Sequence, residues 1–492
     1  MTPLSSATRP RRHRVAAVAL AALVALALPV AEAKLPRPVA RAFIDADLPL
    51  TAVSVVVQEA SLATPLFAHA ADRSMSAASV MKLVTTFAGL ELLGPDYRWK
   101  TEAYLGGPLT DGTLSGDLIL KGYGDPKITV EQWQSFMATL RAQGLAAVTG
   151  DLVLDRSHFG LPPHDPAAFD GEALKPYNVG ADALLVNFKS LRFVFAPNAA
   201  GDGVDLRAEP PLPQVALGTP PRLGIGECGD WRAALGAEFA DRAAGARATF
   251  AGRYPAGCAE RDWYVALLDA PHYALGMFTT YFRETGGRFG GDVREGRAPP
   301  GAAPFATLAS PPLSEVVRDI NKLSNNVMAR QLFLTLATAA HPPPATPALA
   351  ADAVRQWLTD RRIRMPGLVL ENGSGLSRAE RVSANGLARL LLAADASRVR
   401  EAFAGSLAVA AVDGTVQRRF RNGAVAGQAL LKTGTLEGVR ALAGYVIDAD
   451  GRRWVVVALI NHPNAARGQA ALDALVQWVY RDASGWRETP GR

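Results

Sequence analysis

The stretch SAASVMKLVTTFAGLELLG, residues Ser76–Gly94, decides the fold, because it predicts a buried helix with two reactive side chains near its start. Apolar residues occur on almost every side of this stretch, which indicates a helix inside a domain. Ser79 and Lys82 are three residues apart, so they share one helix face and the amine can reach the hydroxyl. Gly94-Pro95 is a helix stop signal. A Ser-x-x-Lys pair also occurs by chance in most long chains, so its partners must be sought elsewhere.

Strands are expected on both sides of this helix in the sequence. Residues 51–58 and 65–70 read as a hairpin rich in Val and Phe, and residues 429–435, 439–448 and 454–461 as strands near the C-terminus. A single hairpin is too small to be stable alone, so we expect the two groups to pair in one antiparallel sheet. A last helix is predicted at about 466–480, and two helices are expected to meet at residues 324–326.

The middle of the chain has a different sequence pattern, in which short β-like runs are separated by glycines and a proline-rich stretch follows at 297–304. We therefore predict an α+β fold in which residues 34–98 and 300–492 form one domain. Residues 99–299 are expected to be a β-rich insertion of two smaller domains, at about 99–185 and 186–299. A chain of 492 residues is long enough for two or three domains.

The N-terminus predicts export. Four arginines before residue 15 precede the apolar run 15–30, and Ala31-Glu32-Ala33 is a small-x-small cleavage site, so residues 1–33 fit a secretory signal peptide. An uncleaved anchor is the alternative, although the apolar run is shorter than a bilayer span. Cleavage after about Ala33 lowers the formal charge from +6 to +3. We expect a periplasmic protein with no transmembrane segment in the mature chain.

Composition also argues against several other classes of function. Basic residues form no long run and do not alternate with aromatic residues, so nucleic acid is not an expected partner. The seven histidines include no metal-binding spacing, and neither a metal nor another cofactor is predicted. In an oxidising compartment the two cysteines, Cys228 and Cys258, are expected to form a disulfide.

Two further motifs accompany Ser79 and Lys82 in chain order: Ser324-Asn325-Asn326 and Lys432-Thr433-Gly434. Serine becomes a good nucleophile only when a base removes its proton, and Lys82 can act only when neutral. Burial on an apolar helix and the positive charge of Lys432 would both lower the pKa of Lys82. Each motif alone is more often an ordinary helix cap or strand end. Their order, together with the export signal, favours a catalytic trio.

The second and third motifs can be given roles on chemical grounds. Ser324 could pass a proton to the leaving amine, and the amide of Asn326 suits a peptide backbone in the cleft. Lys432 and Thr433, on a strand at the sheet edge, could hold a substrate carboxylate. Gly434, on the same strand, would leave room for substrate. The backbone N–H groups of Ser79 on the helix and of Thr435 on the strand would form an oxyanion hole.

These motifs resemble the D-alanyl-D-alanine carboxypeptidases/endopeptidases of the class C low-molecular-mass penicillin-binding proteins, the penicillin-binding protein 4 type. Further similar pieces are GDLILKGYGDP at 116–126, GDLVLDRSHF at 150–159, ENGSGLSR at 371–378 and VDGTVQRRF at 412–420. The 242 residues from Lys82 to Ser324 are too many for a simple β-lactamase. In the family, two extra domains interrupt a β-lactamase/transpeptidase-like domain, an antiparallel sheet flanked by helices, after the Ser-x-x-Lys helix.

The resemblance implies a serine DD-peptidase that cleaves D-Ala-D-Ala termini or D-Ala-diamino acid cross-links of peptidoglycan stem peptides. Ser79 would be the acylated nucleophile and Lys82 the general base. β-Lactam antibiotics would acylate Ser79 as inhibitors, and Asp155 would lie near the diamino acid side chain. A serine β-lactamase and a non-catalytic cell-wall-binding protein of the same fold are the alternatives. A β-lactamase would hydrolyse its acyl-enzyme faster, and a non-catalytic relative would be expected to lack one of the motifs.

Overall fold

The computed structural model describes residues 35–240 and 244–486, and the predicted signal peptide at 1–33 lies outside them. The described chain belongs to a single compact unit. None of its helices combines the length and apolar character that crossing a membrane requires.

A six-stranded antiparallel sheet unites the two ends of the chain, as the sequence predicts. Its strands follow the order β2-β1-β24-β23-β22-β21, with bounds Phe67–His69, Val53–Glu59, Arg453–Asn461, Val439–Ile447, Ala429–Leu436 and Ala408–Val409. Val53 pairs with Ile460 and Glu59 with Trp454, so the N-terminal strand lies along the whole of β24. This pairing brings the predicted hairpin and the C-terminal strands into one domain.

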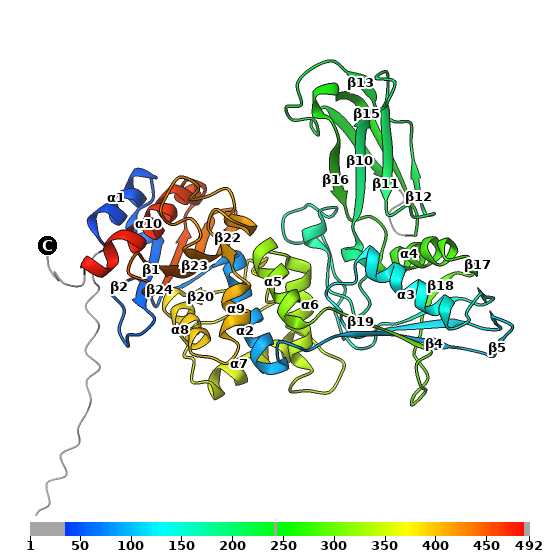
Figure 1. The fold of residues 1–492 in the computed structure, drawn as a ribbon, viewed down its shortest axis with the longest axis horizontal. Helices are drawn as coiled ribbons and strands as arrows, with labels where there is room; N and C mark the ends of the chain where they lie inside the picture. Colours follow the sequence, from blue (N-terminus) through cyan, green and yellow to red (C-terminus); the bar gives the residue numbers. More distant parts are fainter. Residues whose placement is uncertain (1–34, 241–243, 487–492) are drawn as a thin grey trace, which may run out of the picture. The chain divides into compact units, whose positions relative to one another are not determined.

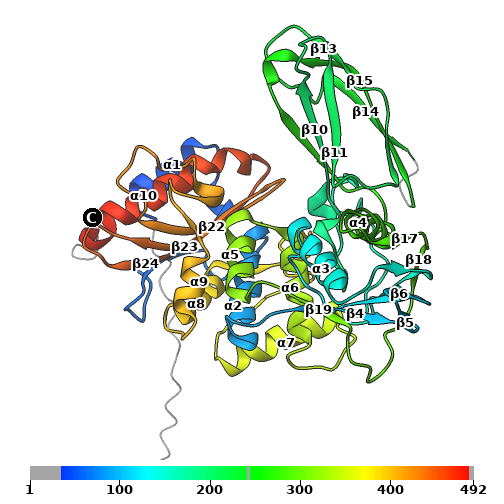
Figure 2. The ribbon, with the colours of Figure 1, turned by 45° about the vertical axis from the view of Figure 1, so that its right-hand side comes forward.

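The two faces of this sheet are covered by different helices. On β24 the side chains of Val455, Val457 and Leu459 enter one core, and the alternate residues enter the other. The helices α1 (Arg37–Asp45) and α10 (Gln469–Trp486) cover one face, and α2 and α8 (Ala384–Asp395) the other (Figures 1 and 2). Side chains of a strand alternate between its faces, which explains why β24 is apolar from Trp454 to Ile460.

The stretch Ser76–Gly94 is helical from Ala78 to Leu93, although its first turn is tighter than an α-helix. Ala78–Met81 forms the 3-10 helix η2, and Lys82–Leu93 forms α2, which ends before Gly94 at a φ of 86°. It packs against α5 (Leu313–Leu323), α6 (Asn326–Ala337), α7 (Pro347–Asp360) and α9 (Arg400–Gly405). Helix α2 is therefore buried among other helices, which agrees with its apolar sequence.

The part of the chain between α2 and α5 is β-rich. A five-stranded sheet has the order β18-β9-β7-β4-β19, with bounds Val293–Glu295, Leu152–Asp155, Leu118–Gly122, Lys100–Leu105 and Ala306–Ala309. A smaller sheet has the order β17-β8-β6-β5, with bounds Arg288–Phe289, Ala147–Val148, Thr113–Leu114 and Leu109–Thr110. Helices α3 (Val130–Ala142) and α4 (Ala270–Glu284) pack on each other. Because β19 pairs with β4, this sheet extends to Ala309.

Residues 191–265 form two further sheets. One has the order β11-β10-β16, with bounds Val204–Glu209, Leu191–Pro197 and Arg261–Val265. The other contains β12, β13, β14 and β15, with bounds Val215–Leu217, Arg222–Gly224, Leu235–Ala240 and Ala246–Pro255. A disulfide joins Cys228 to Cys258, the pair that the sequence analysis selected. Aromatic rings pack between these sheets, including Phe195, Phe250 and Trp263.

Candidate active site

Ser79 and Lys82 are in contact at the junction of η2 and α2. Lys82 Nζ lies 2.8 Å from Ser79 Oγ. The residue before the serine, Ala78, has a φ of 46°, a conformation that costs a non-glycine residue free energy. Ser79 itself is partly exposed, whereas Lys82 is fully buried. The hydroxyl can therefore meet a substrate from solvent while the amine beside it is shielded from water.

Two carbonyl oxygens also contact the buried amine. Lys82 Nζ donates to Asn326 Oδ1 at 2.6 Å and to the backbone oxygen of Ser374 at 2.5 Å. A neutral amine has two hydrogens and one lone pair. If both hydrogens go to these carbonyls, the lone pair is left for the proton of the Ser79 hydroxyl. This set of three neighbours suits a neutral lysine acting as a base.

The electrostatic surroundings also favour the neutral form of Lys82. Burial lowers the pKa of Lys82 well below its ordinary value, and the charge of nearby Lys432 lowers this pKa further. Glu380 acts in the opposite direction, and Arg330 adds a small lowering effect. The two causes that the sequence suggested are thus the two largest ones in the structure.

The turn between α5 and α6 presents the second motif. Ser324 ends α5 with a φ of 58°, a left-handed conformation that reverses the chain direction. The side chain of Asn325, rather than that of Asn326, caps α6 by accepting from Met328 N at 3.1 Å. This leaves the Asn326 side chain free to reach Lys82, and its amide nitrogen remains available for a substrate.

The third motif lies on β22 with its lysine turned inward. Lys432 is fully buried, and its Nζ donates to Ser324 Oγ at 2.9 Å and to Thr433 O at 2.8 Å. Burial lowers the pKa of Lys432 to about 7. Both its forms are therefore populated near neutral pH in the free protein, and no carboxylate of the described residues forms an ion pair with it. From the sequence alone, a charged amine is expected at this position.

The same strand forms an open edge beside the nucleophile. Strand β21 pairs only with Leu430 and Leu431, so within the described chain the Lys432–Leu436 half of β22 has a strand partner on one side only. Thr435 is exposed on this half, and the Thr433 hydroxyl donates to Thr415 Oγ1 at 2.8 Å. An extended peptide could add to such an edge.

Gly434 lies directly against the backbone that precedes the nucleophile. A Cβ on Gly434 would lie 2.4 Å from Ala77 O and 3.1 Å from Ala78 Cβ. The missing side chain therefore leaves room for the turn that holds Ser79. The sequence could not show this approach, because it does not indicate which backbone lies next to the strand.

The loop at residues 371–378 belongs to the site, although the sequence analysis assigned it no chemical role. Buried Glu380 accepts hydrogen bonds from the backbone N–H groups of this loop, at Glu371, Asn372, Gly373 and Gly375. These bonds fix Ser374, whose carbonyl contacts Lys82. Gly375 has a φ of 80°, and a Cβ there would lie 1.9 Å from Ala78 O. The closely spaced glycines of ENGSGLSR were the available signal.

Asp155 does not join the cluster. Its side chain is buried, where it accepts from Ser157 Oγ at 2.6 Å and from Ala298 N at 2.9 Å. These neighbours belong to the inserted part of the chain, and Lys121 Nζ lies 3.7 Å away. The cluster of the three motifs thus contains Ser79, Lys82, Ser324, Asn326 and Lys432 but not Asp155.

Comparison with known proteins gives consistent matches over most of the chain. The model of the D-Ala-D-Ala carboxypeptidase 3 (S13) family matches residues 35–481. The chain is 28% identical to D-alanyl-D-alanine carboxypeptidase DacB of Haemophilus influenzae, over 79% of this chain and 80% of that protein. It is 29% identical to D-alanyl-D-alanine carboxypeptidase of an Actinomadura species, over 89% and 82% respectively.

The fold has a match among solved structures as well. Penicillin binding protein 4 (dacB) of Haemophilus influenzae superposes with a TM-score of 0.73 at 24% identity, covering 89% of this chain and 99% of that one. The same protein complexed with a novel β-lactam superposes with a TM-score of 0.70 at 23% identity, covering 90% and 99%. These structures share the transpeptidase/β-lactamase-like architecture with inserted β-rich parts.

Proposed function

The chain belongs to the D-Ala-D-Ala carboxypeptidase 3 (S13) family, and from that premise we propose that it is a serine DD-peptidase whose nucleophile is Ser79. Its substrates are peptidoglycan stem peptides, cut at D-Ala-D-Ala termini, at D-Ala-diamino acid cross-links, or at both. The contact of Ser79 Oγ with a buried, pKa-lowered Lys82 is the observation that carries the assignment of the nucleophile.

Acylation follows from the geometry around Lys82. The neutral amine takes the proton of Ser79, and Oγ attacks the carbonyl carbon of the penultimate D-Ala. The negative oxygen of the tetrahedral intermediate accepts from the backbone N–H groups of Ser79 and Thr435. Loss of one such donor typically lowers the rate about 10²- to 10³-fold. The proton then passes to the departing amine, and the bond between the penultimate D-Ala and that amine breaks.

In deacylation, Lys82 acts as the base for water and then returns a proton to Ser79. After the amine leaves, Lys82 is neutral again and can take a proton from water, whose oxygen attacks the ester carbonyl. The ester bond to Ser79 breaks, and the serine regains its proton from the lysine. Ser324 Oγ, in contact with Lys432 Nζ, gives a polar route by which protons can be exchanged within the site.

Lys432 binds the free carboxylate of a D-Ala-D-Ala terminus in this proposal. A carboxylate beside a buried amine favours the charged form of that amine, so substrate binding is accompanied by protonation of Lys432. The Thr433 hydroxyl and Thr415 beside it supply further polar groups. A β-lactam presents both a strained amide and a carboxylate, so it fits the same groups and forms an ester with Ser79.

Two alternatives are less well supported. The family match runs through the inserted part, residues 99–309, which a simple β-lactamase does not need. A non-catalytic wall-binding protein would be expected to lack part of the site, whereas the side chains of Lys82, Asn326 and Lys432 are all placed for chemistry. With the predicted signal peptide, we assign the enzyme to the periplasm.

Release of D-Ala from a synthetic pentapeptide ending in D-Ala-D-Ala tests the proposal. We expect release by the wild type and by Ser76→Ala, a matched control on the same turn whose backbone contacts to Asn461 survive the change. We expect no release by Ser79→Ala. Folded wild type that liberates no D-Ala, or Ser79→Ala that keeps its rate, contradicts the assignment.

A further inference from the structure

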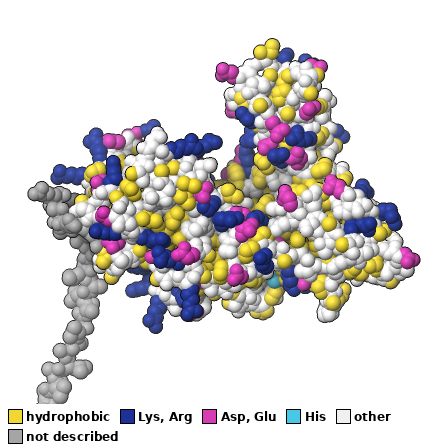
Figure 3. Space-filling view, viewed as in Figure 1, with side chains coloured by type: hydrophobic (Ala, Val, Ile, Leu, Met, Phe, Trp, Pro, Cys, Tyr) yellow, Lys and Arg dark blue, Asp and Glu magenta, His cyan; other side chains and the backbone are white. Residues whose placement is uncertain are grey.

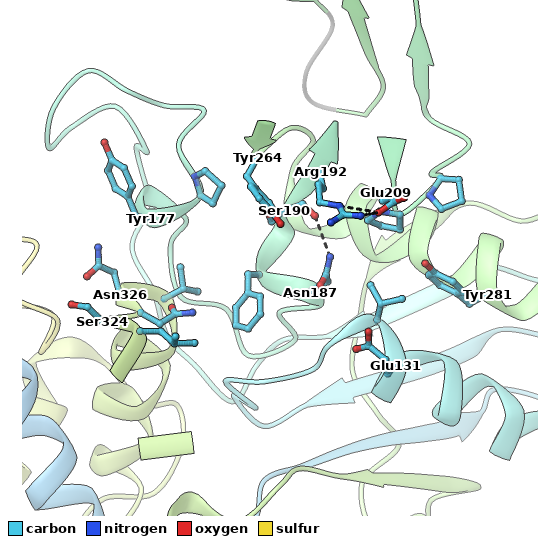
Figure 4. Close-up of a pocket in the computed structure, with 18 residues that line it drawn as sticks. Glu131, Tyr177, Asn187, Ser190, Arg192, Glu209, Tyr264, Tyr281, Ser324 and Asn326 are labelled. Carbon is cyan, nitrogen blue, oxygen red and sulfur yellow. Dashed lines mark hydrogen bonds and ion pairs between the residues drawn. The ribbon is translucent and has the colours of Figure 1, made fainter. Parts of the chain in front are cut away.

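A groove begins at the second motif and continues between α6 and the inserted strands (Figure 4). Ser324 and Asn326 lie at one end, and Glu131 of α3 and Tyr281 of α4 at the other. We propose that this groove binds uncharged, N-acetylated sugar units of the glycan strand that carries the scissile stem peptide. This inference rests on the proposed function and extends it from the peptide to the whole wall polymer.

Exposed aromatic side chains are the first support. Tyr177 of the 3-10 helix Pro176–Asn178 is 40% exposed, and Tyr264 of β16 is 49% exposed. In Figure 4 the Tyr264 ring lies between the Ser324–Asn326 end and the Arg192–Glu209 pair. Large aromatic groups left in solvent have an apolar face and a polar tip, which suits the C–H face and the hydroxyls of a pyranose ring.

The charged side chains that line the groove favour a sugar over a second stem peptide as its occupant. Arg192 is the one cation among the described residues that line the groove, and it is already paired: its Nε lies 2.9 Å from Glu209 Oε2. Its Nη1 lies 3.4 Å from Asp262 Oδ2. Glu131 adds a further negative charge to the lining. Stem peptides carry several carboxylates, so this lining repels a second stem peptide but accepts uncharged hydroxyl and acetamido groups.

An unusual backbone turn forms the wall of the groove. Asn187, Phe188 and Lys189 have φ values of 44°, 54° and 51°, a conformation that is rare for a bulky residue such as phenylalanine. The turn is held by Asn187 Nδ2, which donates to Tyr273 OH at 2.9 Å, and by Lys189 Nζ, which donates to Leu268 O at 2.6 Å. A backbone conformation that costs free energy persists only where the surrounding structure holds it. Such residues cluster at functional sites, which indicates that this turn has a role in binding.

Phe188 is the residue that this turn places. It lines the groove beside Val327, the residue that follows Asn326, and packs against the apolar cluster to which Val327 belongs. The groove wall is thereby in contact with the start of α6, where the second motif binds Lys82. Four extended residues separate the sugar from the reacting carbonyl and span at most about 14 Å. The groove begins at Ser324, beside the reacting groups, so a sugar bound within that span of Ser79 can carry the same stem peptide.

The test compares two substrates that share one stem peptide, a disaccharide-pentapeptide and the free pentapeptide. We expect the wild type to cleave the disaccharide-pentapeptide with a kcat/KM at least fivefold higher. Tyr264→Ala is expected to remove this preference while its kcat/KM for the free pentapeptide stays within twofold of wild type. Tyr264→Phe keeps the ring and should keep the preference. Ile225→Ala, an exposed apolar residue of the same inserted region outside the groove lining, is the control.

Several outcomes overturn the inference without affecting the proposed function. One is equal cleavage of both substrates by the wild type, and another is an equal loss on both substrates in Tyr264→Ala. A third is a loss in Tyr264→Ala on a cross-linked peptide dimer that carries no sugar, which identifies a second stem peptide as the occupant. Failure of the wild type to cleave either substrate, with no labelling by penicillin, instead contradicts the proposed function itself.

Discussion

Two buried lysines, Lys82 and Lys432, carry the chemistry at the scale of single residues. Burial lowers the pKa of each lysine, and the charge of Lys432 lowers the pKa of Lys82 further. Their neighbours separate their roles: Lys82 contacts the nucleophile and two carbonyl oxygens, whereas Lys432 contacts Ser324 and its own strand. One amine is therefore suited to take a proton, and the other to receive a carboxylate.

Burying Lys432 has a cost in stability that depends on pH. Its pKa is about 7 in the folded protein, whereas an unfolded chain holds this proton up to about pH 10.4. Between these values the unfolded state binds more protons, so stability rises with pH through this window. The destabilising effect of Lys432 is complete below pH 7 and disappears near pH 10.5.

Lys432→Met should therefore stabilise the protein while abolishing peptidase activity. At pH 7 we expect a gain of about 1–3 kcal/mol, which is less than the pKa shift alone implies, because the hydrogen bonds to Ser324 and Thr433 are lost. Thermal unfolding from pH 6 to pH 10 measures the gain, which should shrink as pH rises. Lys175→Met, at a side chain 44% exposed, is the control. A Lys432→Met protein no more stable than wild type at pH 7 contradicts this interpretation.

At the scale of elements, the site depends on how closely three backbone segments approach each other. Strand β22 passes the η2 turn at Gly434, and the Glu380-bound loop passes it at Gly375. Asn461 at the end of β24 holds the chain just before η2, because its side chain bonds both Ser76 N and Ser76 O. The turn that carries Ser79 is thus held by two close backbone approaches and by the Asn461 side chain.

Gly434→Ala tests the closest of these approaches. Its methyl group would lie 2.4 Å from Ala77 O, so β22 and the η2 turn must move apart. We expect acylation by penicillin to slow about 10²-fold, since a displacement of about 1 Å in a catalytic site can have that effect. Gly405→Ala is the matched control, because an added methyl group there meets nothing within 4 Å. Equal acylation rates in the two variants would show that the packing at Gly434 does not position Ser79.

Elements were predictable from the sequence wherever local pattern decides them. The apolar helix, the N-terminal hairpin and the C-terminal strands follow from periodicity and from turn residues, and the structure confirms them. The 3-10 turn at Ala78–Met81 was not predictable, because close contacts from Gly375 and Gly434, hundreds of residues away, surround it. The buried role of Glu380 was hidden for the same reason.

At the scale of the molecule, function depends on convergence of distant segments. Lys82 contacts Asn326 across 244 residues and Ser374 across 292. The order of the motifs indicated that they meet, but not which atoms touch. Asp155 rests on resemblance alone, and its side chain is buried, where it accepts from Ser157 Oγ and Ala298 N; its contact with a substrate stays a prediction.

The inserted part carries charged side chains of both signs and is tied to the catalytic helices by ion pairs. In Figure 3, Lys and Arg side chains lie among Asp and Glu side chains on the inserted part. Ion pairs also join the insertion to the catalytic helices: Lys127 Nζ lies 2.7 Å from both Glu315 and Asp319 of α5. The insertion therefore contacts the same helix that leads into Ser324.

The position of a covalent penicillin adduct tests the central claim most directly, that distant segments converge to activate one serine. After labelling of folded wild type, mass spectrometry of the tryptic digest should place the adduct on the peptide Ser74–Lys82, at Ser79. Ser79→Ala should carry no label, and Ser76→Ala should be labelled as wild type is. An adduct on any other peptide, or folded wild type that penicillin does not label, contradicts the account.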